Sequence, residues 1–143
     1  MAYGMQPINV TAATLTLDKD THGFTTVTVN RAAGCAITLP TANGDGTVFD
    51  IYVGTTISSN SLSIAAPDAN TIIQGTLAVC TDIGGTVAPT STTSDTITMS
   101  GSTTGGIVGS RVFLKDVAVG VWAVSGGLVA SGTEATPFSA AVP

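Results

Sequence analysis

The stretch TITMSGSTTGGIVGSRVFLKDVAVGVWAVSG, residues 96–126, decides the fold of this chain of 143 residues. Residues 96–99 alternate polar and apolar side chains, residues 111–117 place Val112 and Leu114 on one face, and residues 121–124 form a short apolar run. Alternation with a period of two is typical of half-buried β-strands. Because only short, glycine-rich connections separate the segments, we expect three neighbouring antiparallel strands. Trp122 is the only tryptophan, and we expect its large apolar ring to point into the core.

The rest of the chain repeats this pattern. In residues 47–53, Phe49, Ile51 and Val53 should face inward, and Asp50 and Tyr52 outward. The residues NGDG at 43–46 predict a β-hairpin turn. Residues 84–95 lack a pattern and predict an exposed loop, whereas residues 128–130 predict a last edge strand. Further short strands are expected at residues 14–17, 24–29, 35–39, 62–64, 71–74 and 77–80.

No stretch of ten residues keeps apolar groups at helical spacing, and turn signals recur about every 8–12 residues. We therefore predict an all-β fold, a single antiparallel β-sandwich of jelly-roll-like form. Residues 1–10 are predicted to form an extended N-terminal arm, residues 11–132 the sandwich domain, and residues 133–143 an irregular C-terminal tail.

The composition indicates a protein that meets other protein. Charged residues make up 9% of the chain, against about 25% in typical domains, while 43% is hydrophobic. A surface of threonine, serine, glycine and alanine is easily desolvated, because few charges must lose their water. We therefore expect an obligate assembly.

Charge and patterning also exclude several classes of function. The net charge is −5, and four basic residues cannot supply the basic stripe that nucleic-acid binding requires. No window approaches the roughly 18 consecutive apolar residues of a membrane span. The N-terminal residues lack the basic and apolar regions of a secretory signal, which predicts synthesis and assembly in a cytoplasm.

No residue pattern predicts catalysis, a cofactor or a metal. His22, the only histidine, lies in the polar stretch 18–23 and is expected to be a solvated turn residue. Asp18 and Asp20 have the spacing that opens a calcium loop, but the closing glutamate is missing. We expect Cys35 and Cys80 to be buried, reduced thiols, although a bridge between them is an alternative that the sequence leaves open.

One segment combines an aromatic residue with charges on one strand face. Phe113 shares its face with Arg111 and Lys115, so it either packs beneath their stems in the core or forms an interface anchor. Asp50 and Tyr52 make a weaker patch of the same kind. Apolar residues of the two chain ends could bridge to a neighbouring subunit by strand addition. The candidate interface residues are Tyr3, Met5, Asp50, Tyr52, Arg111, Phe113, Lys115 and Phe138.

The order of several segments resembles small structural proteins of tailed bacteriophages, above all the head decoration or cement proteins. These segments are ITLP followed by TANGDG, then DIYVGTTISSNSLSI, then residues 96–124, then SGTEATPFSA. The resemblance covers residues 37–140 and includes no catalytic signature. It implies a β-rich, non-enzymatic subunit, commonly trimeric, that binds the major capsid protein on the outer surface of the phage head and stabilises the shell.

Two other functions are compatible with the same residues. The domain could bind a receptor or glycan at the tip of a phage tail fibre or spike, or it could build fibres or tails by self-association alone. A glycan-binding module is expected to expose aromatic rings for sugar stacking, and this chain has few candidates for that role.

Overall fold

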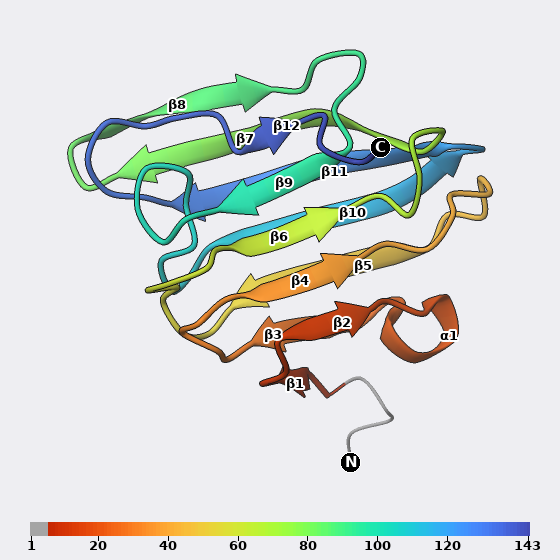
Figure 1. The fold of residues 1–143 in the computed structure, drawn as a ribbon, viewed down its shortest axis with the longest axis horizontal. Coiled ribbons are helices and arrows are strands. Elements are labelled where there is room, and N and C mark those ends of the chain that lie inside the picture. The colour runs from red at the N-terminus through yellow and green to blue at the C-terminus, as the bar shows by residue number, and fades with distance from the viewer. Residues whose placement is uncertain (1–5) are drawn as a thin grey trace.

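A computed structural model describes residues 6–143 and shows two β-sheets packed face to face as a sandwich (Figure 1). The predicted all-β sandwich is confirmed. The larger sheet has seven strands in the order β1-β3-β5-β10-β11-β7-β8, and the smaller has five in the order β12-β9-β6-β4-β2. The strands are β1 (Ile8–Val10), β2 (Thr14–Thr16), β3 (Thr26–Val29), β4 (Cys35–Thr38), β5 (Val48–Val53), β6 (Leu62–Ala65), β7 (Ile72–Thr81), β8 (Gly84–Pro89), β9 (Thr96–Met99), β10 (Arg111–Ala118), β11 (Val121–Val129) and β12 (Phe138–Ser139).

The first six strands alternate between the two sheets. β1, β3 and β5 are parallel neighbours in the seven-stranded sheet, and β2, β4 and β6 are parallel neighbours in the five-stranded sheet. Each turn of the chain therefore adds one strand to each layer. The prediction of antiparallel pairing fails for these strands and for β7 with β11, because period-two alternation marks the face of a strand and not the direction of its neighbour.

The turn at residues 43–46 is not a hairpin. It carries the chain from β4 in one sheet to β5 in the other. Gly44 and Gly46 have the positive φ angles that the sequence predicted, 79° and 81°. An Asn-Gly-Asp-Gly sequence specifies this backbone shape, but the strands that it joins need not pair.

The segment that decided the fold prediction is divided between the layers. β10 and β11 form the expected antiparallel hairpin. β9, however, pairs with β6 and β12 in the five-stranded sheet, so residues 100–110 cross from one layer to the other. The expectation of three adjacent strands is therefore wrong for β9, since a loop of this length can span the sandwich.

Several predicted boundaries also differ from the structure. The two runs at residues 71–74 and 77–80 are one strand, β7, and residues 128–129 continue β11 in mid-sheet. Part of the predicted loop at 84–95 is the edge strand β8, which pairs with β7. β1 lies within the predicted arm, and β12 lies within the predicted irregular tail. Short strands with glycine or few apolar residues give almost no periodic signal, which explains these misses.

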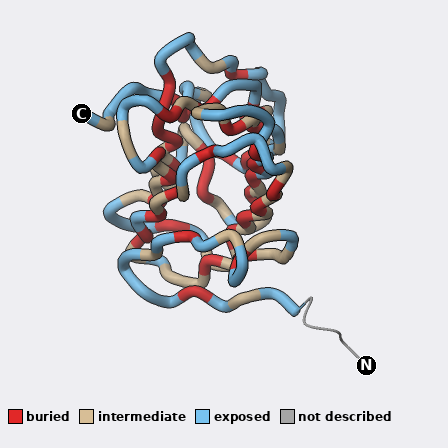
Figure 2. The backbone as a smooth tube through the Cα atoms, turned by 90° about the vertical axis from the view of Figure 1, so that its right-hand side faces the viewer, coloured by how far each residue is buried: buried red, intermediate tan, exposed pale blue. Residues whose placement is uncertain are grey.

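The core lies between the two sheets, and Figure 2 marks the buried residues in red along the backbone. Phe49, Ile51, Leu114 and Trp122 are fully buried, as their alternation predicted. The rings of Phe49 and Trp122 lie 5.3 Å apart, and the indole N–H of Trp122 donates a hydrogen bond of 3.0 Å to the carbonyl of Pro40. Each such side chain contributes roughly 1.5–3 kcal/mol through burial.

The polar stretch at residues 18–23 contains a single helical turn, α1 (Lys19–His22), which no pattern predicted. The carboxylate of Asp18 accepts hydrogen bonds from the backbone N–H groups of Asp20 and Thr21 and so caps the turn. His22 is 8% exposed, which contradicts the expected solvated side chain. The backbone N–H of Asp18 donates a hydrogen bond of 2.9 Å to Nδ1 of His22, and this bond holds the imidazole ring against the short helix.

The cysteines are both free, so no bridge joins them. Cys35 is buried as expected, whereas Cys80 is exposed on β7, which corrects the prediction of two buried thiols. Within residues 6–143, the structure has no helix with the length and apolar character needed to cross a membrane.

Candidate functional site

The outer face of β5 and β10 brings together five of the eight predicted interface residues. In the antiparallel register of these strands, Arg111 lies opposite Tyr52 and Phe113 opposite Asp50. Val112, Leu114 and Asp116 point inward, which leaves the alternate side chains of β10 on the outside. We call Asp50, Tyr52, Arg111, Phe113 and Lys115 the outer-face cluster.

Arg111 is the centre of this cluster. Its Nε and Nη2 donate to the two carboxylate oxygens of Asp50 at 2.9 and 3.2 Å, a forked ion pair. The hydroxyl of Thr26 donates to the same carboxylate at 2.7 Å. The guanidinium carbon lies 5.2 Å from the ring centroid of Tyr52 and 5.4 Å from that of Phe113, within the range of a cation–π interaction. The positive charge is thus neutralised and held between two rings.

Phe113 is 39% exposed and lies outside the core, with the guanidinium of Arg111 packed over its ring. The structure therefore excludes a core position for this ring and shows the contact with the arginine. A rigid aromatic group beside a neutralised arginine is the composition found at the energetic centres of protein interfaces. The Arg111–Asp50 pair can therefore contact a partner without leaving either of its two charges unpaired.

The sequence analysis missed Phe24. Its ring is 60% exposed and borders a surface hollow of about 520 Å³ that Thr25, Thr26, Val48 and Asp50 also line. Its φ angle is +59°, a left-handed conformation that is unusual for a bulky residue. A hydrogen bond of 2.7 Å from its backbone N–H to the carbonyl of Val48 holds it there. Alternation places residue 24 in a strand, and only its position after Gly23 could have signalled a turn.

The remaining predicted residues do not join the cluster. Phe138 is only 9% exposed and packs in the core from β12, which corrects its assignment to an interface. It was predicted to be exposed because the tail around it has no periodic pattern. Tyr3 and Met5 lie outside the described residues.

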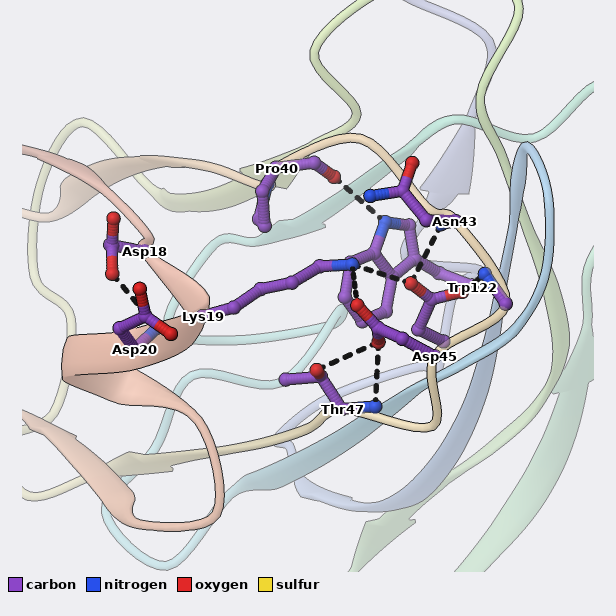
Figure 3. A network of polar contacts seen from close by, with 10 residues as sticks. Asp18, Lys19, Asp20, Pro40, Asn43, Asp45, Thr47 and Trp122 are labelled. Atoms are coloured by element: carbon purple, nitrogen blue, oxygen red, sulfur yellow. Dashed lines mark hydrogen bonds and ion pairs between the residues drawn. The ribbon is translucent and has the colours of Figure 1, made fainter.

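A second polar group, around Lys19, holds the fold together (Figure 3). The Nζ of Lys19 lies 2.7 Å from a carboxylate oxygen of Asp45 and 2.6 Å from one of Asp116, and 5.5 Å from the ring centroid of Trp122. Burial acts to lower the pKa of Lys19, but hydrogen bonds to Asp116 and Asp45 outweigh it and raise the pKa above 10.5. A lysine that stays protonated cannot act as a general base, so we interpret the group as structural.

Asp45 makes this group sensitive to acid. The hydrogen bond from Lys19, followed by those from Thr47, holds the pKa of Asp45 well below its ordinary value of 3.8. A carboxyl whose pKa is lower in the folded state stabilises the fold above its unfolded pKa, and this contribution is lost as the pH falls below about 3.8.

We therefore expect Asp45→Asn to reduce stability at pH 6 and to have a smaller effect at pH 2.5. Urea unfolding midpoints of both proteins at the two pH values measure this difference. Asp82→Asn, at an exposed turn position, is the matched control and should behave like the wild type. An equal effect of Asp45→Asn at both pH values would contradict the assignment.

Within residues 6–143, no three His, Cys, Asp or Glu side chains lie close enough to hold a metal ion. Asp18, one of the two residues with calcium-loop spacing, instead caps α1. The functional assignment of the outer-face cluster rests on its own geometry. No family model matches the chain, and no curated protein or solved structure is significantly similar to it.

Proposed function

We propose that this protein is a non-enzymatic virion structural protein that binds the outer surface of a phage capsid as a trimer and stabilises the head. Its partners would be the major capsid protein and further copies of itself, and it would assemble in the host cytoplasm. The observation that carries this proposal from the structure is the outer-face cluster, with Arg111 held between two rings.

The composition of the surface supports an assembled state. Several large apolar side chains are exposed on different elements, among them Val87, Val119 and Ile83 at 63%, 81% and 93%. The chain also has few charges that an interface would need to desolvate. The order of its segments resembles that of cement proteins, which bind where capsomers meet.

One observation favours a second function, binding of a receptor glycan by a fibre or spike. The exposed ring of Phe24 stands beside the carboxylate of Asp50 at a hollow of about 520 Å³. Sugars stack on aromatic rings and donate hydroxyl hydrogen bonds to carboxylates. Asp50 already accepts three hydrogen bonds, from Arg111 and Thr26, which leaves it less capacity for a sugar and makes head binding our first proposal.

Co-sedimentation with expanded, undecorated heads of the phage that encodes the chain tests the proposal, with mass photometry of the free protein. We expect a trimer in solution and saturable binding at a simple multiple of the capsomer junctions. If the trimer does not bind heads but binds host cells or purified surface glycans, the second function replaces this proposal.

We expect Phe113→Asp to weaken head binding by roughly 30-fold or more, because truncating an interface anchor costs 2 kcal/mol or more. The variant should fold, since the ring is outside the core. Thr86→Asp, at an exposed position of the edge strand β8 of the same sheet, is the matched control and should bind within a few-fold of the wild type. Wild-type binding by a folded Phe113→Asp protein would exclude the cluster as the contact site.

A further inference from the structure

Arg31 is a cation that has no counterion among residues 6–143. Lys19 and Arg111 form ion pairs with aspartates, and Lys115 is exposed on β10. Arg31 is half-buried, yet among residues 6–143 no carboxylate oxygen lies within 4.0 Å of it. Residues 1–5, MAYGM, contain no acidic side chain that could pair with it. A partly desolvated charge of this kind is unfavourable unless another group compensates it.

The guanidinium is held in place from one side. Its Nε donates a hydrogen bond of 2.9 Å to the carbonyl of Gly34, whose own N–H donates to the carbonyl of Arg31 at 3.1 Å. This turn, residues 31–34, also contacts the connection between β5 and β6. The carbonyl of Ala32 accepts a hydrogen bond of 2.7 Å from the backbone N–H of Ser58 in that connection. The two terminal amino groups of Arg31 have no hydrogen-bond acceptor within the part of the chain that the structure describes.

The neighbouring loop is equally constrained. Gly34 has a φ of +79°, and a Cβ at this position would lie 2.0 Å from the carbonyl oxygen of Ser61. Asn60 and Ser61 themselves have φ angles of +58° and +62°. Two turns in such close contact form a rigid wall beside the guanidinium.

Arg31 lines an open hollow of about 210 Å³ at the end of the sandwich where β4 and β6 begin. Asn60, Ser61 and Ser63 also line it, and none of the lining residues among residues 6–143 is acidic. Burial raises the pKa of the Cys35 thiol, also in the wall, against the opposing effect of Arg31. The thiol is therefore protonated near neutral pH and supplies no negative charge.

We infer that this hollow is a binding site for a single carboxylate group. A guanidinium with its Nε occupied still offers its two amino groups as a fork that matches the two oxygens of a carboxylate. Hydrogen bonds from Asn60, Ser61 and Ser63 can satisfy the remaining lone pairs. Only one cation lines the hollow and the chain carries a net charge of −5, so a monovalent carboxylate suits it better than a phosphate dianion.

This site lies on the five-stranded sheet side, and the outer-face cluster lies on the seven-stranded sheet, so the inference does not depend on the proposed function. The carboxylate could belong to an acidic side chain of a partner chain or to a small free acid. Both sources share the chemistry that the hollow recognises. Two probes, sodium acetate and the α-amide of N-acetylglutamic acid, separate them, since only the second carries the side-chain stem and flanking peptide groups.

The site is tested by titrating the full-length, ¹⁵N-labelled protein with each probe. NMR spectra monitor the backbone amide signals of Gly34, Asn60 and Ser61 during the titration. We expect saturable shifts with a millimolar dissociation constant. The α-amide of N-acetylglutamine, which has the same shape without the charge, should produce none. Tighter binding of the glutamate probe than of acetate would assign the site to a protein side chain, and the reverse order would assign it to a free acid.

Variants identify the residue responsible. Arg31→Gln should weaken binding at least 10-fold, the equivalent of one charge-assisted hydrogen bond, while Asp82→Asn, at an exposed turn position, should leave it unchanged. Arg31→Lys keeps the charge but removes the pair of amino groups that can bind both carboxylate oxygens, so it should bind several-fold more weakly. This variant replaces Arg31→Gln in the test if Arg31→Gln does not fold. Equal shifts with the neutral probe, unchanged binding by Arg31→Gln or Arg31→Lys, or tighter binding of inorganic phosphate than of acetate would overturn the inference.

Discussion

Replacing Asp116 with alanine is expected to lower the free energy of unfolding by about 3–5 kcal/mol, the cost of breaking a buried ion pair by removing one partner. The Asp116 side chain is fully buried and accepts hydrogen bonds from Lys19 Nζ at 2.6 Å and from the backbone N–H groups of Asn43 and Gly44 at 2.8 and 2.7 Å. The substitution removes one of the two carboxylates that pair with Lys19, whose bond to Asp45 remains, and it leaves the two backbone N–H groups without their acceptor.

Urea unfolding followed by tryptophan fluorescence measures this loss, because Trp122 lies beneath Lys19. Asp82→Ala removes an exposed carboxylate from the turn between β7 and β8 and should cost less than about 0.5 kcal/mol. An Asp116→Ala protein as stable as the Asp82→Ala protein would show that the ion pair does not hold the crossing at residues 43–46.

Replacing Gly101 with alanine is expected to cost roughly 3 kcal/mol or more, through both backbone strain and steric overlap. Gly101 has a φ of +85°, and a Cβ there would lie 1.8 Å from the carbonyl oxygen of Ile57. The clash is with backbone, so no side-chain rotation relieves it. The loop that crosses between the sheets would have to separate from the β5–β6 connection.

Gly46 provides the matched control. Its φ is +81°, and nothing lies within 4 Å of a Cβ built on it. Gly46→Ala should therefore cost only the left-handed strain, roughly 1–2 kcal/mol. Thermal unfolding of the two variants separates strain from overlap, and equal melting temperatures would show that the close approach of Gly101 to Ile57 does not matter.

Strand faces were predictable from the sequence, but most strand partners were not, the β10–β11 hairpin excepted. The burial of Phe49 and Ile51 follows from alternation, because a period of two assigns each side chain to a face, and that of Trp122 follows from its size. The same alternation fits a parallel or an antiparallel neighbour, in either sheet. For this reason β9 was predicted to lie beside β10, although it lies in the other sheet. A glycine-rich loop can either close a hairpin or cross the sandwich.

The candidate site was predictable only in part, for a related reason. Alternation along β10 identified the shared face of Arg111, Phe113 and Lys115, but the forked pair with Asp50 depends on the register of β5 against β10. Lys19 and Asp116 lie on elements far apart in the chain and meet only in the folded sandwich. Phe24 depends on one unusual φ angle, for which its residue type gives no signal.

The alternating course of the first six strands has a consequence for the order of folding during synthesis. Ile8 lies beside Val27 and Val27 beside Ile51, so each new strand can pair with one that the ribosome released shortly before. The later strands differ, because Ile72 of β7 lies beside Val121 of β11 and must wait for a much longer stretch to be made. We therefore expect the growing chain to order its N-terminal half first, with β5 and β6 as open edges until β10 and β9 arrive to cover them.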